Sequence, residues 1–248
     1  MPEALFNTQV FEQDNLKITV FDIPAITEQI KTVIDNEICS ICLGANQEDL
    51  QNVKRALKRR SQSWTDKQKM GNVAEFFIHL YMSLTGYKQE FLFFNLEENS
   101  LKKGFDGLYT IGEQHWIMES KSGTNTSHNS KVKEAFNDLK AKITTGVENN
   151  PWRNAYNHAS HRDVGSAENL LNNLRVMARD FETGQYQSID DKNIMPCATI
   201  FLDGVWTEQD HDAIIESIKN IEELSGQYIH VICVTQTSYQ LFLQYLEE

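Results

Sequence analysis

The sequence predicts an α/β fold with a mixed sheet, because apolar residues recur with helical spacing in some segments and with strand spacing in others. Five segments have the pattern of helices, at 65–84, 130–145, 167–182, 208–224 and 239–246. Five runs are typical of strands, at 90–96, 105–111, 115–121, 196–202 and 228–234. In chain order they give α-β-β-β-α, an inserted helix, and then β-α-β-α.

The segment before this core is predicted to be an αβ extension. Residues 16–23 (LKITVFDI) have the composition of a strand, and residues 25–43 and 47–60 the spacing of helices. The run SQSW at 61–64 breaks this region from the long helix that follows. The sequence therefore predicts an N-terminal extension at 1–63 and a main domain at 64–248.

Composition indicates a folded protein of the cytoplasm. Of the 248 residues, 40% are hydrophobic and 23% are charged, which is ordinary for a soluble domain. No apolar run approaches the roughly 18 residues that can span a bilayer, so no membrane association is expected. The N-terminus is polar and acidic, which is not typical of a targeting signal.

The formal net charge of −12 disfavours unassisted binding to nucleic acid, since affinity for phosphate comes largely from Lys and Arg. One basic cluster stands out in the run NVKRALKRR, and it comprises Lys54, Arg55, Lys58, Arg59 and Arg60. This cluster is either a phosphate-binding surface or a solvated helix face. A more basic partner that delivers DNA would also account for an acidic chain.

Two of the four cysteines, Cys39 and Cys42, form a C-x-x-C pair inside an apolar stretch that is predicted to be helical. A structural zinc site needs four ligands, and the sequence has no second C-x-x-C or H-x-x-x-H pair to complete one. Disulfides are not expected without secretion. We therefore expect these cysteines to lie in the core or on a helix face.

The chain lacks the sequence motifs of several common enzyme classes. The P-loop pattern G-x-x-x-x-G-K-[ST] is absent, so ATP hydrolysis by that mechanism is not expected. No G-x-S-x-G or G-x-G-x-x-G lies between a strand and a helix, which argues against a hydrolase elbow and a dinucleotide site.

The strongest candidate site lies in GFDGLYTIGEQHWIMESKSG, residues 104–123. Glu119 and Lys121 are two residues apart on one predicted strand, so their side chains leave the same face. Asp106 lies on the preceding predicted strand, and a hairpin that closes around Glu113 would place it at nearly the same height. Two carboxylates and a lysine therefore converge.

This combination suits the hydrolysis of a phosphodiester bond. Asp106 and Glu119 offer the hard oxygen ligands of Mg²⁺, with Mn²⁺ as the other possible ion. A bound metal polarises the phosphoryl oxygen and lowers the pKa of an attacking water. Lys121 would orient that water or stabilise the charge that develops on the phosphate. Glu75, on the apolar helix at 65–84, is an unusual carboxylate that would reach the same metal or its water.

The alternative interpretation is a hairpin whose charged side chains are simply solvated. An E-x-K pair is frequent by chance, and Asp-Gly is a common turn pair. Against this, Gly104 and Gly107 flank Asp106 and would let a substrate backbone approach closely. The predicted burial of the helix that carries Glu75, and the position of Asp106 on the adjoining strand, favour a catalytic site over a solvated hairpin.

Other polar residues leave alternatives open. His79, one turn from Glu75, either orients that carboxylate or is a satisfied core histidine. His158 and His161 fall in the segment 148–165, predicted to be a long irregular loop, where they either contact phosphate or are ordinary loop residues. The lysines of the helix at 130–145 either line a groove or are solvated, and they are Lys131, Lys133, Lys140 and Lys142.

The order of helix with Glu75, strand, strand with Asp106, strand with Glu119-x-Lys121, helix and strand resembles the core of the PD-(D/E)XK nuclease superfamily. The resemblance implies a restriction-endonuclease-like α-β-β-β-α-β core with a mixed central sheet and C-terminal β-α additions. It implies that Asp106, Glu119 and Glu75 are the metal-binding acids, with Mg²⁺ as cofactor, and that Lys121 is the catalytic lysine. The chain departs from the pattern in one respect, because no proline precedes Asp106.

The runs GNVAEFFIHLYM, KKGFDGLY and WIMESKSG are similar to the nuclease subunit of Hachiman-type antiphage defence systems, the HamA-like family that also includes the AbpA antiphage proteins. This narrower resemblance implies DNA as substrate and a superfamily-2 helicase subunit (HamB-like) as the partner in a heterodimer. The helicase would grip DNA for an acidic cutting subunit. Two alternatives remain, namely a catalytically degenerate subunit that binds and regulates a partner protein, and a stand-alone nuclease or RNase of the same fold.

Overall fold

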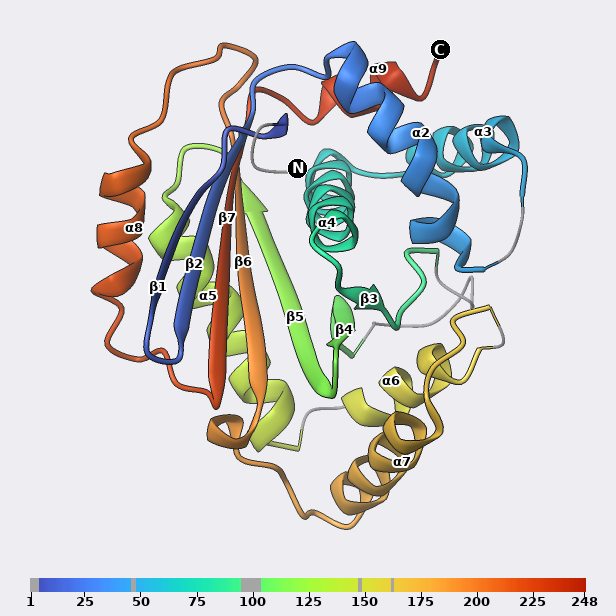
Figure 1. Ribbon diagram of the computed structural model, residues 1–248, viewed down its shortest axis with the longest axis vertical. Coiled ribbons are helices and arrows are strands. Elements are labelled where there is room, and N and C mark those ends of the chain that lie inside the picture. Colours follow the sequence, from blue (N-terminus) through green and yellow to red (C-terminus); the bar gives the residue numbers. More distant parts are fainter. Residues whose placement is uncertain (1–4, 46–47, 95–103, 147–148, 162) are drawn as a thin grey trace.

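The architecture centres on one sheet, whose strands follow the order β1-β2-β7-β6-β5-β4-β3 (Figure 1). The structure is a computed structural model that describes residues 5–45, 48–94, 104–146, 149–161 and 163–248. The strands are β1 (Gln9–Gln13), β2 (Leu16–Ile23), β3 (Lys88–Gln89), β4 (Gly107–Ile111), β5 (Gln114–Gly123), β6 (Asn193–Phe201) and β7 (Tyr228–Gln236). The central strands β2, β7, β6 and β5 pair in parallel, and the outer pairs are antiparallel. The predicted α/β fold with a mixed sheet is confirmed.

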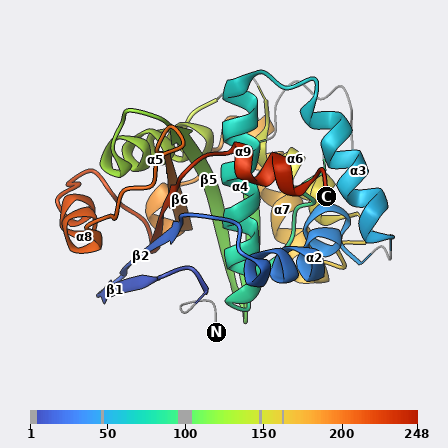
Figure 2. The same ribbon diagram turned by 90° about the horizontal axis from the view of Figure 1, so that it is seen from above.

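Helices cover both faces of the sheet, as the view from above shows (Figure 2). On one face of the sheet, α5 packs against β5 and β6, and α8 packs against β2. On the other face, α4 packs against β5, and α2 packs against α4. The helices are α2 (Glu28–Leu43), α3 (Leu50–Ser61), α4 (Asp66–Leu84), α5 (His128–Thr144), α6 (Pro151–Ala159), α7 (Glu168–Glu182), α8 (His211–Lys219) and α9 (Gln240–Tyr245). In the described ranges, no helix combines the length and apolar character needed to cross a bilayer.

Helix α4 packs on the face of the sheet opposite to α5. Thr65 caps it through a reciprocal capping box with Gln68, which fixes its start where the sequence predicts one. Every residue from Val73 to Met82 is buried, so the helix is covered on all sides. Glu75 and His79 are therefore carried into the interior.

The predicted strand at 90–96 is wrong for its described part. Strand β3 ends at Gln89, and the residues up to Phe94 lie outside any strand, while residues 95 and 96 lie outside the described residues. The backbone N–H groups of Phe93 and Phe94 donate to the carbonyls of Ile41 and Cys42 at 3.0 and 3.3 Å. Carbonyls in the last turn of a helix lack partners within it, so this apolar run completes the end of α2 in place of a longer strand.

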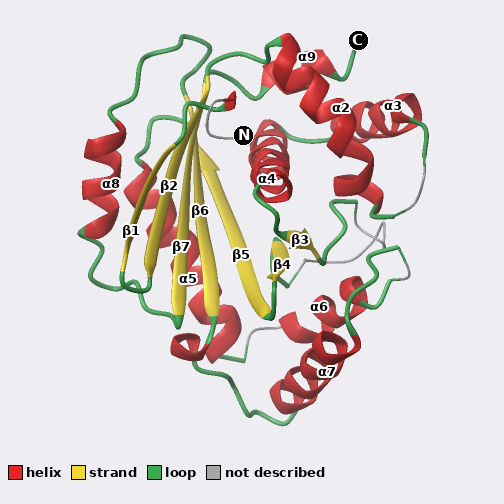
Figure 3. Cartoon of the chain, viewed as in Figure 1, coloured by secondary structure: helices red, strands yellow, loops and turns green. Residues whose placement is uncertain are grey.

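The predicted irregular loop at 148–165 is also wrong, because helix α6 forms within it (Figure 3). Asn150 caps the helix, and Pro151 takes the first helical position, where a missing N–H costs nothing. Trp152, Ala155 and Ala159 are buried along one side. The polar composition of the segment concealed this narrow apolar stripe.

The N-terminal strands belong to the same sheet as the rest of the chain. Strand β2 pairs in parallel with β7 over its whole length, from Leu16 opposite Ile229 to Ile23 opposite Gln236. Strand β1, which the sequence did not predict, pairs with β2 as an antiparallel edge. The division at residue 63 stays a prediction, but strands from both sides of it share one sheet.

All four cysteines are free thiols. Cys42, Cys197 and Cys233 are buried, and Cys39 is half-buried on α2. This agrees with the expectation that Cys39 and Cys42 belong to the core and a helix face.

Candidate active site at the open end of the β4–β5 hairpin

Glu119 and Lys121 lie in β5 on the face of the sheet that α5 covers. Their alternate spacing on the strand gives them a common face, as the sequence predicts. The ammonium of Lys121 lies 2.9 Å from Oε1 of Glu119 and 2.6 Å from Oδ2 of Asp138, which belongs to α5. The strand therefore brings the acid and the lysine together, and α5 adds a second carboxylate.

A second lysine holds the other oxygen of Glu119. The ammonium of Lys142, from the last turns of α5, lies 2.5 Å from Oε2 of Glu119. Glu119 is only 2% exposed, and a charge so far from water requires charged or hydrogen-bonding partners. Lys142 and Lys121 together supply them.

The contributions of α5 are only weakly marked in the sequence. Lys142 is one of four helix lysines that either line a groove or are solvated, and no motif includes Asp138. The four-residue spacing of Asp138 and Lys142 places them on one side of the helix. That spacing could have marked them as a pair, but not which strand they face.

Asp106 lies directly before β4, one residue outside the strand on which the sequence placed it. The paired register of the hairpin ends at Gly107 opposite Met118, and Asp106 lies just beyond it. The backbone N–H of Asp106 donates to the carbonyl of Met118 at 3.1 Å, and its Oδ2 accepts the N–H of Ser120 at 2.9 Å. These bonds fix the carboxylate at the height of Glu119.

The electrostatics of Asp106 indicate an excess of negative charge at this point. Its pKa is raised to about 7, first by burial and then by the charges of Glu119 and Glu75. Lys142 and the N–H of Ser120 act in the opposite direction. Carboxyls that resist ionisation beside other acids are typical of functional sites, where a cation compensates the charge.

Glu75 approaches from α4 and is 8% exposed. Its Oε1 lies 3.5 Å from Nε2 of His79, and Nδ1 of His79 lies 2.5 Å from the hydroxyl of Tyr109 on β4. His79 is thus next to Glu75, as the sequence predicts, and also connects α4 to the hairpin. Glu75 is close enough to Asp106 for its charge to raise the pKa of that residue.

The surroundings of Lys121 define what it can do chemically. Burial alone acts to lower its pKa, but the negative charges of Glu119, Asp138 and Asp106 outweigh that effect and raise the pKa above its usual value. Lys121 therefore remains protonated at neutral pH. It can orient a water molecule or stabilise a negative charge, but it is not poised to accept a proton.

The acids fit a magnesium ion as a two-carboxylate site. Asp106 and Glu119 provide oxygen ligands, and Mg²⁺ often takes only one or two carboxylates and keeps several waters. In the residues that the structure describes, no group of three or more His, Cys, Asp or Glu side chains is arranged to hold a metal ion. A bound ion would thus be held by Asp106 and Glu119, with water as the remaining ligands.

Gly104 and Gly107, the two glycines near Asp106, allow close packing against other residues of the protein. A Cβ on Gly104 would lie 2.6 Å from Cα of Pro151, so α6 requires the glycine. A Cβ on Gly107 would lie 2.9 Å from Cε of Met118. Close approach of a substrate is therefore not needed to explain either position.

The basic cluster of α3 lies apart from this site and divides into two parts. Lys54 is buried with its ammonium 4.0 Å from the ring centroid of Tyr245, and Lys58 lies 3.7 Å from Glu247, so both hold the C-terminal segment. A polar groove is lined instead by Arg55, Arg59 and Arg60. Only these arginines remain as a basic surface.

The histidines of the 148–165 segment have structural roles. His158 is buried and stacks on Phe91, with 4.8 Å between ring centroids. His161 lies 3.8 Å from Asp163 in the turn after α6. The interpretation of these residues as ordinary structural groups is the better one.

The family of the chain is shown by comparison with known proteins. A model of the HamA family matches residues 3–248, which is nearly the whole chain. No match was found among curated proteins. The match covers all three motifs on which the resemblance rests, together with the strands and helices that position Asp106, Glu119 and Lys121. The chain therefore belongs to the HamA family, a subunit family of the Hachiman antiphage defence system.

Proposed function

We propose that this chain is a metal-dependent nuclease that cleaves phosphodiester bonds of DNA as the cutting subunit of its defence system. The observation that carries the proposal is the hydrogen bond from the N–H of Ser120 to Oδ2 of Asp106 at 2.9 Å, which holds this carboxylate beside Glu119, with Lys121 at 2.9 Å from Glu119. Two carboxylates beside a permanently protonated lysine are the groups that this reaction requires. The raised pKa of Asp106 supports the same assignment.

Each side chain has a separate part in the proposed reaction. A bound Mg²⁺ or Mn²⁺ supplies polarisation of the phosphoryl oxygen and a water of lowered pKa. Asp106 and Glu119 hold the ion, and the N–H of Ser120 fixes the orientation of Asp106. Lys121 orients the attacking water or stabilises the charge on the phosphate. Glu75 adds a third acid near Asp106.

Lys142 balances the charge of the site before substrate arrives. Its ammonium lies 2.5 Å from Oε2 of Glu119, so it would compete with a metal ion for this carboxylate. If Glu119 held an ion, the ammonium of Lys142 would be available to a phosphate oxygen of the substrate.

The partner that we propose is a superfamily-2 helicase subunit that loads DNA onto the acidic chain. The net charge of −12 opposes tight binding of DNA by the chain alone. Several of its lysines are already committed to acids or aromatic rings. A partner that grips the phosphates would supply the missing affinity.

Cleavage assays test this proposal. Supercoiled DNA, single-stranded DNA and RNA are incubated with the chain alone and with its helicase partner, in Mg²⁺, Mn²⁺ or EDTA. We expect cleavage of DNA that EDTA abolishes and that Glu119→Gln or Lys121→Ala reduces at least about 100-fold. Lys67→Ala, an exposed lysine at the far end of α4, is the matched control. Cleavage of RNA alone would contradict the choice of substrate, and cleavage that survives both variants would contradict the site.

A catalytically degenerate subunit that regulates its partner is the second candidate. It is favoured by the two lysines that already hold both oxygens of Glu119, and by the absence of a three-ligand metal group in the described ranges. Calorimetric titration with Mn²⁺ separates the candidates. The nuclease requires binding that is lost in Asp106→Asn and Glu119→Gln, whereas the degenerate subunit forms its complex without any such binding.

A further inference from the structure

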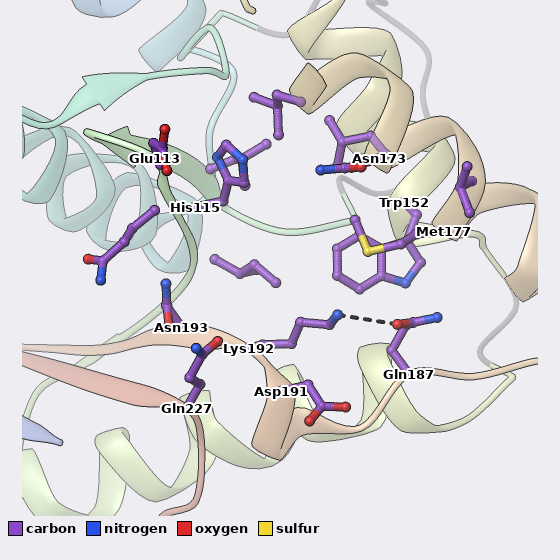
Figure 4. Close-up of a pocket in the computed structure, with 16 residues that line it drawn as sticks. Glu113, His115, Trp152, Asn173, Met177, Gln187, Asp191, Lys192, Asn193 and Gln227 are labelled. Carbon is purple, nitrogen blue, oxygen red and sulfur yellow. Dashed lines mark hydrogen bonds between the residues drawn. The ribbon is translucent and has the colours of Figure 1, made fainter. Parts of the chain in front are cut away.

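A cavity of about 480 Å³ lies between the sheet and the helices α6 and α7, at the ends of β5 and β6 where these parallel strands begin (Figure 4). This volume is in the range of sites that bind small organic ligands. Its apolar lining includes Leu108, Ile117, Trp152, Leu170, Leu174 and Met177. The cavity contains none of Asp106, Glu119 and Lys121, so it is distinct from the candidate active site.

Three buried polar atoms of the lining have no hydrogen-bond partner among the described residues. They are Nδ1 of His115, the indole nitrogen of Trp152 and Oδ1 of Asn193. Trp152 is 1% exposed and Asn193 is 8% exposed. An unsatisfied buried polar group costs about 1–3 kcal/mol, so three such atoms in residues that line one cavity favour a polar ligand toward which these side chains turn.

The cation of the cavity lining is Lys192. Lys192 extends along the cavity toward Gln187, to whose Oε1 its ammonium donates at 3.2 Å, and the ammonium lies 5.8 Å from the ring centroid of Trp152 (Figure 4). Both acids of the lining, Glu113 and Asp191, are exposed at its rim. Of the three charged lining residues, Lys192 is therefore the half-buried one.

The neutral polar groups are mostly amides. The lining includes Gln114, Asn173, Gln187, Asn193 and Gln227. Burial lowers the pKa of His115, so its imidazole is neutral and either donates or accepts a hydrogen bond. Amides and a neutral imidazole suit a molecule whose edge carries both donors and acceptors.

We propose that this cavity binds a nucleobase. A flat ring would contact the apolar walls, as bases commonly do with aromatic and aliphatic side chains. Asn193 and His115 would bond its polar edge, and Lys192 would pair with a ring carbonyl or with the phosphate of the same nucleotide. A metal ion is disfavoured by the single cation and the apolar walls, and a purely apolar ligand by the unsatisfied atoms.

The base belongs either to a free nucleotide or to an unpaired nucleotide of a strand. His115 and Glu119 lie on the same face of β5, four residues apart, which is about 13 Å along the strand. A single strand held by one base in the cavity would therefore pass near the acids. This second source rests on the proposed nuclease function, whereas the preference of the cavity for a base does not.

Calorimetric titration in EDTA tests the proposal without cleavage. The probes are the four deoxynucleoside 5′-monophosphates, a five-nucleotide single strand, and ribose 5-phosphate, which lacks a base. We expect saturable binding of the probes that carry a base and none of ribose phosphate. Tighter binding of the single strand identifies a strand as the source, and tighter binding of a monophosphate identifies a free nucleotide.

Two variants connect the binding to the cavity. Asn193→Ala and His115→Ala are each expected to weaken binding at least 10-fold, while Asn157→Ala, an exposed asparagine of α6 outside the cavity, leaves it unchanged. His115 is only half-buried, so its variant tests the cavity even if Asn193→Ala does not fold.

Absence of binding at millimolar concentration, equal binding of ribose phosphate, or wild-type affinity in folded His115→Ala would overturn the proposal. Because metal is absent, such a result leaves Glu119-dependent cleavage untouched. Conversely, failure of the cleavage assays leaves base binding intact.

Discussion

The ammonium of Lys142 lies 2.5 Å from Oε2 of Glu119, while Oε1 of the same carboxylate faces Lys121 at 2.9 Å. A metal ion that bound Glu119 would compete with Lys142, because both cations would pair with the same carboxylate. Lys142 comes from α5 and Glu119 from β5, so the packing of one helix on one strand sets the strength of this competition.

Replacing Lys142 by methionine is therefore expected to tighten Mn²⁺ binding by about 5- to 10-fold, where 10-fold corresponds to about 1.4 kcal/mol. Titration calorimetry measures the change. The matched control is Lys140→Met, which removes an exposed lysine two residues earlier on α5 and should leave affinity unchanged. Weaker Mn²⁺ binding in Lys142→Met would contradict the competition.

Asp106 should make the metal-free protein less stable as pH rises. Its pKa is about 7 in the folded state against 3.8 in the unfolded chain, so between these values the folded state holds the proton more tightly and ionisation destabilises it. Asp106→Asn removes this cost, on the order of 4 kcal/mol at pH 8. We expect its melting temperature to exceed that of the wild type by about 8–16 °C at pH 8 and to come close to it at pH 4.

Thermal melts in EDTA at the two pH values measure this difference. Asp14→Asn, at an exposed turn, should shift neither melt by a comparable amount. An Asp106→Asn protein that melts below the wild type at pH 8 would show that the carboxylate stabilises the metal-free fold.

Two buried histidines should give the opposite dependence on pH. Burial lowers the pKa of His128 to about 4 and that of His230 to about 3, below the value of 6.5 in an unfolded chain. The unfolded state therefore binds more protons through this window, and stability falls as pH decreases from 6.5. Each histidine should cost about 2 kcal/mol between pH 7 and pH 5.

Urea unfolding at pH 7 and pH 5 checks this in the Asp106→Asn background, where the opposing effect of that aspartate is absent. His128→Gln should remove about half of the dependence. A stability that is unchanged between the two pH values would mean that water or a rearrangement accommodates both charged rings.

Glu90 links strand β4 to the segment before α7, two parts of the chain that are far apart in the sequence. It is 1% exposed, and its carboxylate accepts from Oγ1 of Thr110 at 2.7 Å, from the ammonium of Lys88 at 3.1 Å and from the hydroxyl of Ser166. Glu90→Ala leaves these donors without their acceptor and is expected to lower the free energy of unfolding by about 2–4 kcal/mol. Urea titration measures it, and exposed Glu222→Ala should change it by less than about 0.5 kcal/mol. If Glu90→Ala and Glu222→Ala lowered the free energy of unfolding by similar amounts, the proposed stabilising role of Glu90 would be wrong.

The parts of the fold that follow from local pattern could be predicted from the sequence. Strand β2 occupies the predicted residues 16–23, and α4 begins after its Thr65 cap, because period and capping are encoded by neighbouring residues. The run after Gln89 and helix α6 could not be predicted in this way. Their conformations depend on the end of α2 and on the burial of Trp152, which are tertiary contacts.

The same distinction applies to the candidate site. Asp106, Glu119 and Lys121 lie within one hairpin, so strand alternation and a short turn were enough to bring them together. Lys142 enters only through the docking of α5 on the sheet. The base-binding cavity likewise forms between elements that are far apart in the chain, and no local signal marks it.

The position of β7 between β2 and β6 also determines when the molecule can be completed during synthesis. Residues 16–23 leave the ribosome early, but their parallel partner at 228–236 follows more than 200 residues later. Until then, β2 and β6 each have an unpaired edge, which favours aggregation and degradation. A chain interrupted before the last strand is therefore expected to be cleared by the cell, so unfinished copies do not accumulate.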